Sequence, residues 1–147
     1  MKSFSKLTVR TSGFVLLFCL LASTFFSPVD TKAQVGSAHD KGITFTIDHV
    51  SRIDHGKRLK VDYTIQSSRQ VSKNAGSPIE NPHIWFGDAM ERGHSVFSKK
   101  TGLNTYKGTI VAPVYQYSTP GEQVTFYTYS ILNQRGRWKV QFYLQGM

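Results

Sequence analysis

Cysteine is almost absent from this chain of 147 residues: the single one, Cys19, lies within an apolar run near the N-terminus. The rest of the chain can therefore form no disulfide bond and contains no cysteine nucleophile. A lipid anchor at Cys19 is not expected, because the preceding residue is Phe18, where lipid attachment requires a small side chain. The folded part of the protein must be stabilised by packing and hydrogen bonds alone.

Common catalytic signatures are also missing from the sequence. It contains no G-x-S-x-G nucleophile elbow, no phosphate-binding glycine loop before a helix and no H-E-x-x-H metalloprotease motif. No window after residue 33 keeps a helical period of apolar residues, so at most one short helix is expected, near residues 88–92. We therefore predict a non-enzymatic protein that uses no cofactor.

Residues 1–33 have the pattern of an export signal. Three basic residues precede a fourteen-residue apolar run over residues 13–26, which is too short to cross a bilayer comfortably. Small side chains predict cleavage after Ala33, and an uncleaved anchor is the alternative. We expect a secreted, extracellular protein, in the medium or associated with the cell wall, with no membrane span in the mature chain.

The mature chain, residues 34–147, has 14 Lys and Arg residues against 8 Asp and Glu residues, a net charge of +6. Such an excess of positive charge attracts anionic surfaces whatever the fold. We expect cell-wall polyanions or another extracellular partner, and no sequence-specific nucleic acid. The alternative is that the charge serves solubility only. The sequence leaves the oligomeric state open.

Alternation of apolar and polar residues is the clearest structural signal, because successive side chains of a strand point to opposite faces. ITFTID (residues 43–48) and RLKVDYTIQ (residues 58–66) alternate in this way. Asp54 and Gly56 between them suit a turn. We therefore predict an antiparallel hairpin with one buried and one solvated face.

The last part of the chain repeats this pattern. VTFYTYSIL and WKVQFYLQ, residues 124–132 and 138–145, predict a second hairpin with Asn133 and Gly136 in its connection. Weaker strand candidates lie at residues 83–86, at residues 94–98 and around Ile110. Pro113 is expected to limit the last of these to a sheet edge or to end it.

About seven short strands with turn signals between them predict an all-β fold, an antiparallel β-sandwich formed by a single domain over residues 34–147. A small barrel is the alternative. The order of signal-like segment, TFTIDHV, RLKVDYTI, TPGEQVTFYTYSI and GRWKVQFYL resembles the small exported immunoglobulin-like domains of Gram-positive, bacillus-type bacteria. The resemblance covers most of the mature chain, and many of these domains have no known function. It implies an immunoglobulin-like binding or structural module, and it assigns no functional residues.

Basic residues gather at both predicted hairpins. They are Lys57, Arg58 and Lys60 in the first and Arg135, Arg137 and Lys139 in the last. Because the first and last strands approach each other in many sandwiches, we expect the two clusters to merge into one basic face that binds anionic polymers. Tyrosines 127, 129 and 143 would add aromatic contacts. The alternative is two solvated turns with tyrosines in the core.

HIWFGDAMERGH, residues 83–94, comes closest to a chemical motif. Its four candidate metal ligands are His83, Asp88, Glu91 and His94, which would serve a metal-assisted hydrolase. Their spacing matches no metalloprotease signature. We favour a strand with Ile84 and Phe86 in the core, His83 and Trp85 on the opposite face, and GDAMERG as an exposed turn. A third hypothesis is a secreted cationic effector or antimicrobial protein.

Overall fold

The computed structural model describes residues 35–70 and 77–144. These residues belong to one compact unit and form ten strands and no helix. The strands are β1 (Gly36–Asp40), β2 (Ile43–Ile53), β3 (Arg58–Ser67), β4 (Ile79–Glu80), β5 (His83–Phe86), β6 (Ala89–Arg92), β7 (His94–Lys100), β8 (Thr105–Pro113), β9 (Gln123–Ile131) and β10 (Gln134–Tyr143). The predicted export signal lies outside the described residues.

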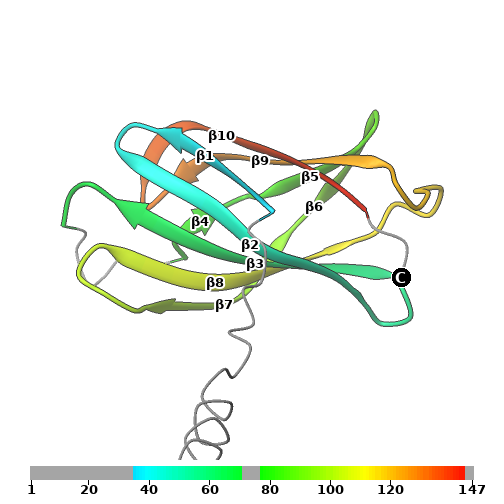
Figure 1. The fold of residues 1–147 in the computed structure, drawn as a ribbon, viewed down its shortest axis with the longest axis horizontal. Coiled ribbons are helices and arrows are strands. Elements are labelled where there is room, and N and C mark those ends of the chain that lie inside the picture. The colour runs from blue at the N-terminus through cyan, green and yellow to red at the C-terminus, as the bar shows by residue number, and fades with distance from the viewer. Residues whose placement is uncertain (1–34, 71–76, 145–147) are drawn as a thin grey trace, which may run out of the picture. The chain divides into compact units, whose positions relative to one another are not determined.

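Two antiparallel sheets form the layers of the fold (Figure 1). Sheet A has the order β1-β2-β3-β8-β7, and sheet B has the order β10-β9-β5-β6, with the short β4 also paired to β9. The prediction of an all-β fold with antiparallel sheets is confirmed. The expected number of about seven strands is too low, because the short strands β1, β4 and β6 lack a long alternating pattern.

The core lies between the two sheets and is built by the alternation seen in the sequence. Ile43, Phe45 and Ile47 of β2 are buried, and every second residue of the paired strand β3 from Leu59 to Ile65 is buried on the same side of sheet A. The Phe45 ring stacks on the Phe126 ring of β9, with a centroid separation of 4.8 Å. This contact joins the two sheets, and the first predicted hairpin is confirmed.

Trp138 connects the second hairpin to the opposite sheet. Its ring is fully buried, and its Nε1–H donates a hydrogen bond to the Ile43 carbonyl oxygen at 3.0 Å. The positive φ angles of the β9–β10 turn occur at Leu132 and Asn133, so the prediction that places Gly136 in this turn is wrong. Gly136 instead lies under Trp138, where a Cβ atom would meet the indole ring at 2.5 Å.

The middle of the chain confirms one strand and corrects its surroundings. Ile84 and Phe86 of β5 are buried, as predicted. The chain then turns over two residues and returns as β6, so neither the short helix near residues 88–92 nor the long exposed turn is present. Pro113 ends β8 as expected, but β8 pairs with both β3 and β7 and is not an edge strand.

The described residues contain no helix that is both long enough and apolar enough to span a bilayer.

Candidate functional site

A row of cationic and aromatic side chains crosses the outer face of sheet B. Lys139 of β10 is paired with Tyr127 of β9, Tyr127 with His83 of β5, and His83 with Arg92 of β6. Paired residues of antiparallel strands project from the same face. Three strand spacings of about 4.8 Å therefore place the two ends of the row about 14 Å apart at the backbone.

A second row lies beside the first on the same face. It runs through Gln141, Thr125, Trp85 and Met90, and Gln141 Nε2 donates a hydrogen bond to Thr125 Oγ1 at 3.5 Å. The Trp85 side chain is 38% exposed and offers an aromatic surface to solvent. Neither row contains a carboxylate, so the face combines positive charge, rings and amide groups.

Further aromatic and basic side chains extend the face toward the β9–β10 turn and along β10. Tyr127 and Tyr129 pack edge to face with ring centroids 4.3 Å apart. Burial raises the pKa of Tyr127 above its ordinary value of 10.0, and the neighbouring Tyr129 hydroxyl raises it further, while the charge of Arg137 lowers it. Tyr127 is therefore a neutral hydrogen-bonding group at physiological pH.

We define the sheet B face as the exposed or half-buried residues of these rows and their extension. Its members are His83, Trp85, Met90, Arg92, Thr125, Tyr127, Tyr129, Arg135, Arg137, Lys139, Gln141 and Tyr143. Arg137, Lys139, Gln141 and Tyr143 share the outward side of β10, because Trp138, Val140 and Phe142 between them are buried.

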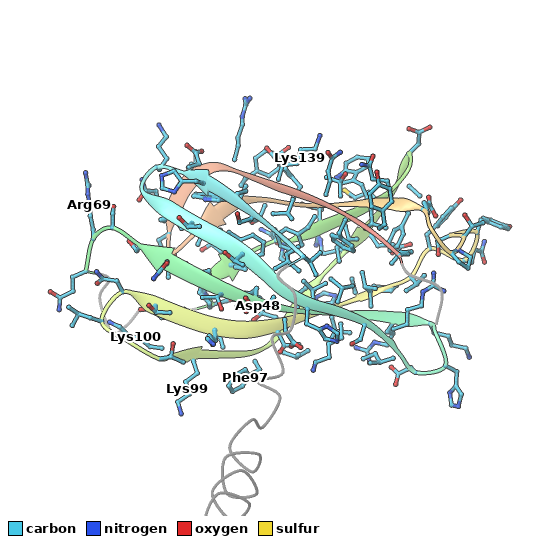
Figure 2. All side chains as sticks on the ribbon, in the orientation of Figure 1. Asp48, Arg69, Phe97, Lys99, Lys100 and Lys139 are labelled. Carbon is cyan, nitrogen blue, oxygen red and sulfur yellow. The ribbon has the colours of Figure 1, made fainter. Side chains whose placement is uncertain are left out.

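The first basic cluster lies elsewhere. Lys57 lies in the β2–β3 turn, Arg58 begins β3, and Lys60 projects from the outer side of sheet A. Arg135 and Arg137 lie at the other end of β2, because Asp40 Oδ2, next to the β1–β2 turn, accepts a hydrogen bond from the Arg137 backbone N–H at 2.7 Å. Figure 2 shows Lys139 above the sandwich and Lys99 of sheet A below it. The six predicted residues therefore form two separate groups, and the expectation of one merged face is wrong.

The two groups also differ in their carboxylate neighbours. Arg58 Nη1 lies 3.2 Å from Asp54 Oδ2, and Lys60 Nζ lies 3.2 Å from Asp62 Oδ2. Within residues 35–70 and 77–144, the basic residues of the sheet B face take part in no ion pair. In this part of the chain, the first group thus has two of its three basic residues paired with carboxylates, whereas the basic residues of the sheet B face are unpaired.

The four candidate metal ligands of residues 83–94 do not converge. His83 pairs with Arg92 and projects outward, whereas Glu91 pairs with the buried Ile84 and projects to the inner side. Asp88 lies in the β5–β6 turn, and His94 begins β7 in the other sheet. Among the described residues no group of three His, Cys, Asp or Glu side chains is arranged to hold a metal ion.

Sequence reasoning missed half of the sheet B face as binding residues, including the members on β5 and β6. His83, Trp85 and Arg92 belong to residues 83–94, the segment considered as a metal site. They join the face because β5 pairs with β9 and β6 pairs with β5. Alternation within HIWF indicates that His83 and Trp85 share an outer side. No local pattern indicates that this side continues into β9 and β10.

Comparison with family models, curated proteins and solved structures found no match for this chain.

Proposed function

We propose that this protein is an exported, non-enzymatic, immunoglobulin-like domain that binds anionic polymers of the cell surface through the sheet B face. The row from Lys139 to Arg92 carries the proposal, because it presents cations and rings across four strands without a carboxylate. Cations attract the charged groups of a polymer, and aromatic rings provide flat surfaces on which its other groups can stack.

The strand order supports an immunoglobulin-like topology. In such domains one sheet has the order A-B-E-D, and the other has the order G-F-C, extended in some domains by C′. Strands β2-β3-β8-β7 follow the first order and β10-β9-β5-β6 the second, with β1 as an additional edge strand. The buried tryptophan of antibody domains lies on strand C, whereas here Trp138 is on the last strand and Trp85 is partly exposed.

The pattern of residues 1–33 supports export. A basic start, a short apolar run and small residues before position 34 are the parts of a secretory signal. The absence of cysteine from the mature chain agrees with an exported domain that does not use disulfide bonds. Cell-wall polymers are then the polyanions that the protein meets first.

The direct test is to partition the mature protein between buffer and purified bacterial walls over a salt series. One wall sample keeps its anionic polymers, and a matched sample has been stripped of them. We expect retention at low salt that falls steeply toward 0.15 M, where the Debye length is about 8 Å, and little retention on stripped walls. Retention that ignores salt or survives stripping would contradict the proposal.

A further inference from the structure

A pocket lies at the end of the sheet B face, beside the β9–β10 turn. Its volume is about 430 Å³, and its lining residues are Glu80, Tyr129, Ser130, Asn133, Arg135 and Gly136. Small-molecule sites commonly have volumes of about 300–1,000 Å³. The pocket is therefore large enough for one small ligand or for one unit of a polymer.

The backbone around the pocket is held in an unusual conformation. Leu132 and Asn133 have φ angles of 54° and 61°, and a left-handed conformation is uncommon for a bulky residue such as leucine. The Leu132 N–H donates a hydrogen bond to the Pro78 carbonyl oxygen at 2.8 Å, which ties the turn to the segment that carries Glu80. The turn thus places Asn133 and Glu80 at one pocket.

A β-bulge gives the pocket its other wall. The pairing of β10 with β9 shifts between Arg135 and Trp138, and bulges commonly redirect side chains next to binding sites. Gly136 allows this bulge, because any larger residue there would strike the Trp138 ring and the Asp40 carboxylate. Arg135 and Tyr129 are therefore presented by a defined backbone rather than by a long loop.

The pocket differs chemically from the rest of the face. It contains one carboxylate and one guanidinium, and within the described part of the chain neither Glu80 nor Arg135 forms an ion pair. Asn133 adds a group that both donates and accepts hydrogen bonds. The Tyr129 side chain is 57% exposed, and Tyr127 packs against its ring. The negative charge of Glu80 would repel a free phosphate group in this pocket. Hydrogen-bond donors and acceptors beside the Tyr129 ring instead suit an uncharged molecule with several hydroxyl groups.

We propose that this pocket binds a neutral sugar ring, with its apolar face on Tyr129 and its hydroxyl groups on Glu80, Asn133 and Arg135. The pocket site follows from the residues that line it. We further propose that the polymer bound by the sheet B face contains sugar units, and this second step rests on the proposed function. The polymer then contacts the cationic row through its charged groups and this pocket through one sugar.

The test is an NMR titration of the isotope-labelled mature protein with D-glucose, N-acetylglucosamine and glycerol 3-phosphate. At least one sugar is expected to shift the signals of Asn133, Arg135 and Gly136 saturably, with an affinity that does not depend on salt. Glycerol 3-phosphate is charged and has no ring, and it is expected to leave these signals unchanged. Saturation of the pocket by the phosphate alone, or by none of the three probes, would overturn the proposal.

Variants separate the pocket from the charged row. Tyr129→Ala and Glu80→Gln are each expected to weaken sugar binding about tenfold, the effect of losing one stacking or charge-assisted contact. Tyr129→Phe keeps the ring and is expected to keep binding, as is the double variant Arg137→Gln/Lys139→Gln. Unchanged sugar affinity in Tyr129→Ala would contradict the proposal. Sugar binding without retention on walls would refute the proposed function but would still support a sugar site in the pocket.

Discussion

Replacing Arg137 and Lys139 together by glutamine removes two positive charges from the sheet B face and leaves the core intact. Both side chains are exposed, and the hydrogen bond between Asp40 and residue 137 uses the backbone N–H, which glutamine retains. The variant should therefore fold normally. Any change in polymer binding then reports on charge at this face.

The size of the effect follows from counterion release. If Arg92, Arg137 and Lys139 each neutralise one phosphate, the plot of log affinity against log salt has a slope of about −2.1, on the scale of about 0.7 per contact for single-stranded phosphate chains. A threefold rise in salt then weakens binding about tenfold. The double variant keeps one contact, so its slope falls to about −0.7 and the same rise in salt weakens binding about twofold.

The assay is fluorescence anisotropy of labelled inorganic polyphosphate from about 0.05 to 0.15 M salt. The matched control is Arg58→Gln/Lys60→Gln, which changes net charge equally but acts on residues already beside Asp54 and Asp62. We expect the control to keep the wild-type slope. Equal loss of slope in both variants would show that only net charge matters and would refute the assignment to sheet B.

Three further predictions concern the fold that supports this face. Trp138→Phe removes the indole N–H that donates to the buried Ile43 carbonyl oxygen, so urea unfolding should show a loss of about 2–4 kcal/mol; wild-type stability would contradict this role. Gly136→Ala should cost about 1–3 kcal/mol in the same assay, because its Cβ overlaps the Trp138 ring, and an unchanged unfolding midpoint would be the contrary result. Burial raises the pKa of Tyr63 above 10.0, and the nearby Ser95 side chain lowers it in part. The folded protein thus holds this proton more tightly than the unfolded chain, and stability that is complete below pH 10 is lost as pH rises through the raised pKa. Tyr63→Phe should reduce this alkaline loss, and an identical loss in both proteins would exclude Tyr63 as its source.

Local patterns predict the two hairpins because each of their strands has one buried and one solvated side. Alternation from Ile43 to Ile47 and from Trp138 to Phe142 is enough to identify strands and their inner faces. The same rule identifies Ile84 and Phe86 as core residues although HIWF is only four residues long. These strands form because they bury large apolar side chains on one side, and this burial appears in the sequence as apolar–polar alternation.

The short strands β1 and β6 lack this alternation because they form through hydrogen-bonded pairing with a neighbouring strand and not through burial of an apolar side of their own. Gly36 of β1 faces Val140 of β10 so closely that a Cβ atom would lie 2.8 Å from Val140 Cγ1, and β1 is otherwise held by β2. Strand β6 has the polar sequence AMER and depends on β5 across a two-residue turn. Neither strand has an apolar alternation of its own.

The part of the candidate site on β10 could be predicted from the sequence, but its continuation across β9, β5 and β6 could not, for a similar reason. Alternation along one strand shows that Arg137 and Lys139 share a side with Tyr143. Alignment of Arg92 with Lys139 depends on three successive strand registers, which involve residues far apart in the sequence. Separation of the Lys60 group from the Arg137 group likewise depends on which sheet each strand joins.

Mapping the polymer contact by NMR tests the central claim most directly. Labelled mature protein is titrated at low salt with anionic polymer released from walls, and backbone shifts are followed in both sheets. We predict that the largest shifts occur at Lys139, Tyr127, His83 and Arg92 and that they reverse at high salt. Shifts centred on Lys57, Arg58 and Lys60, or spread evenly over both sheets, would contradict a binding site on the sheet B face.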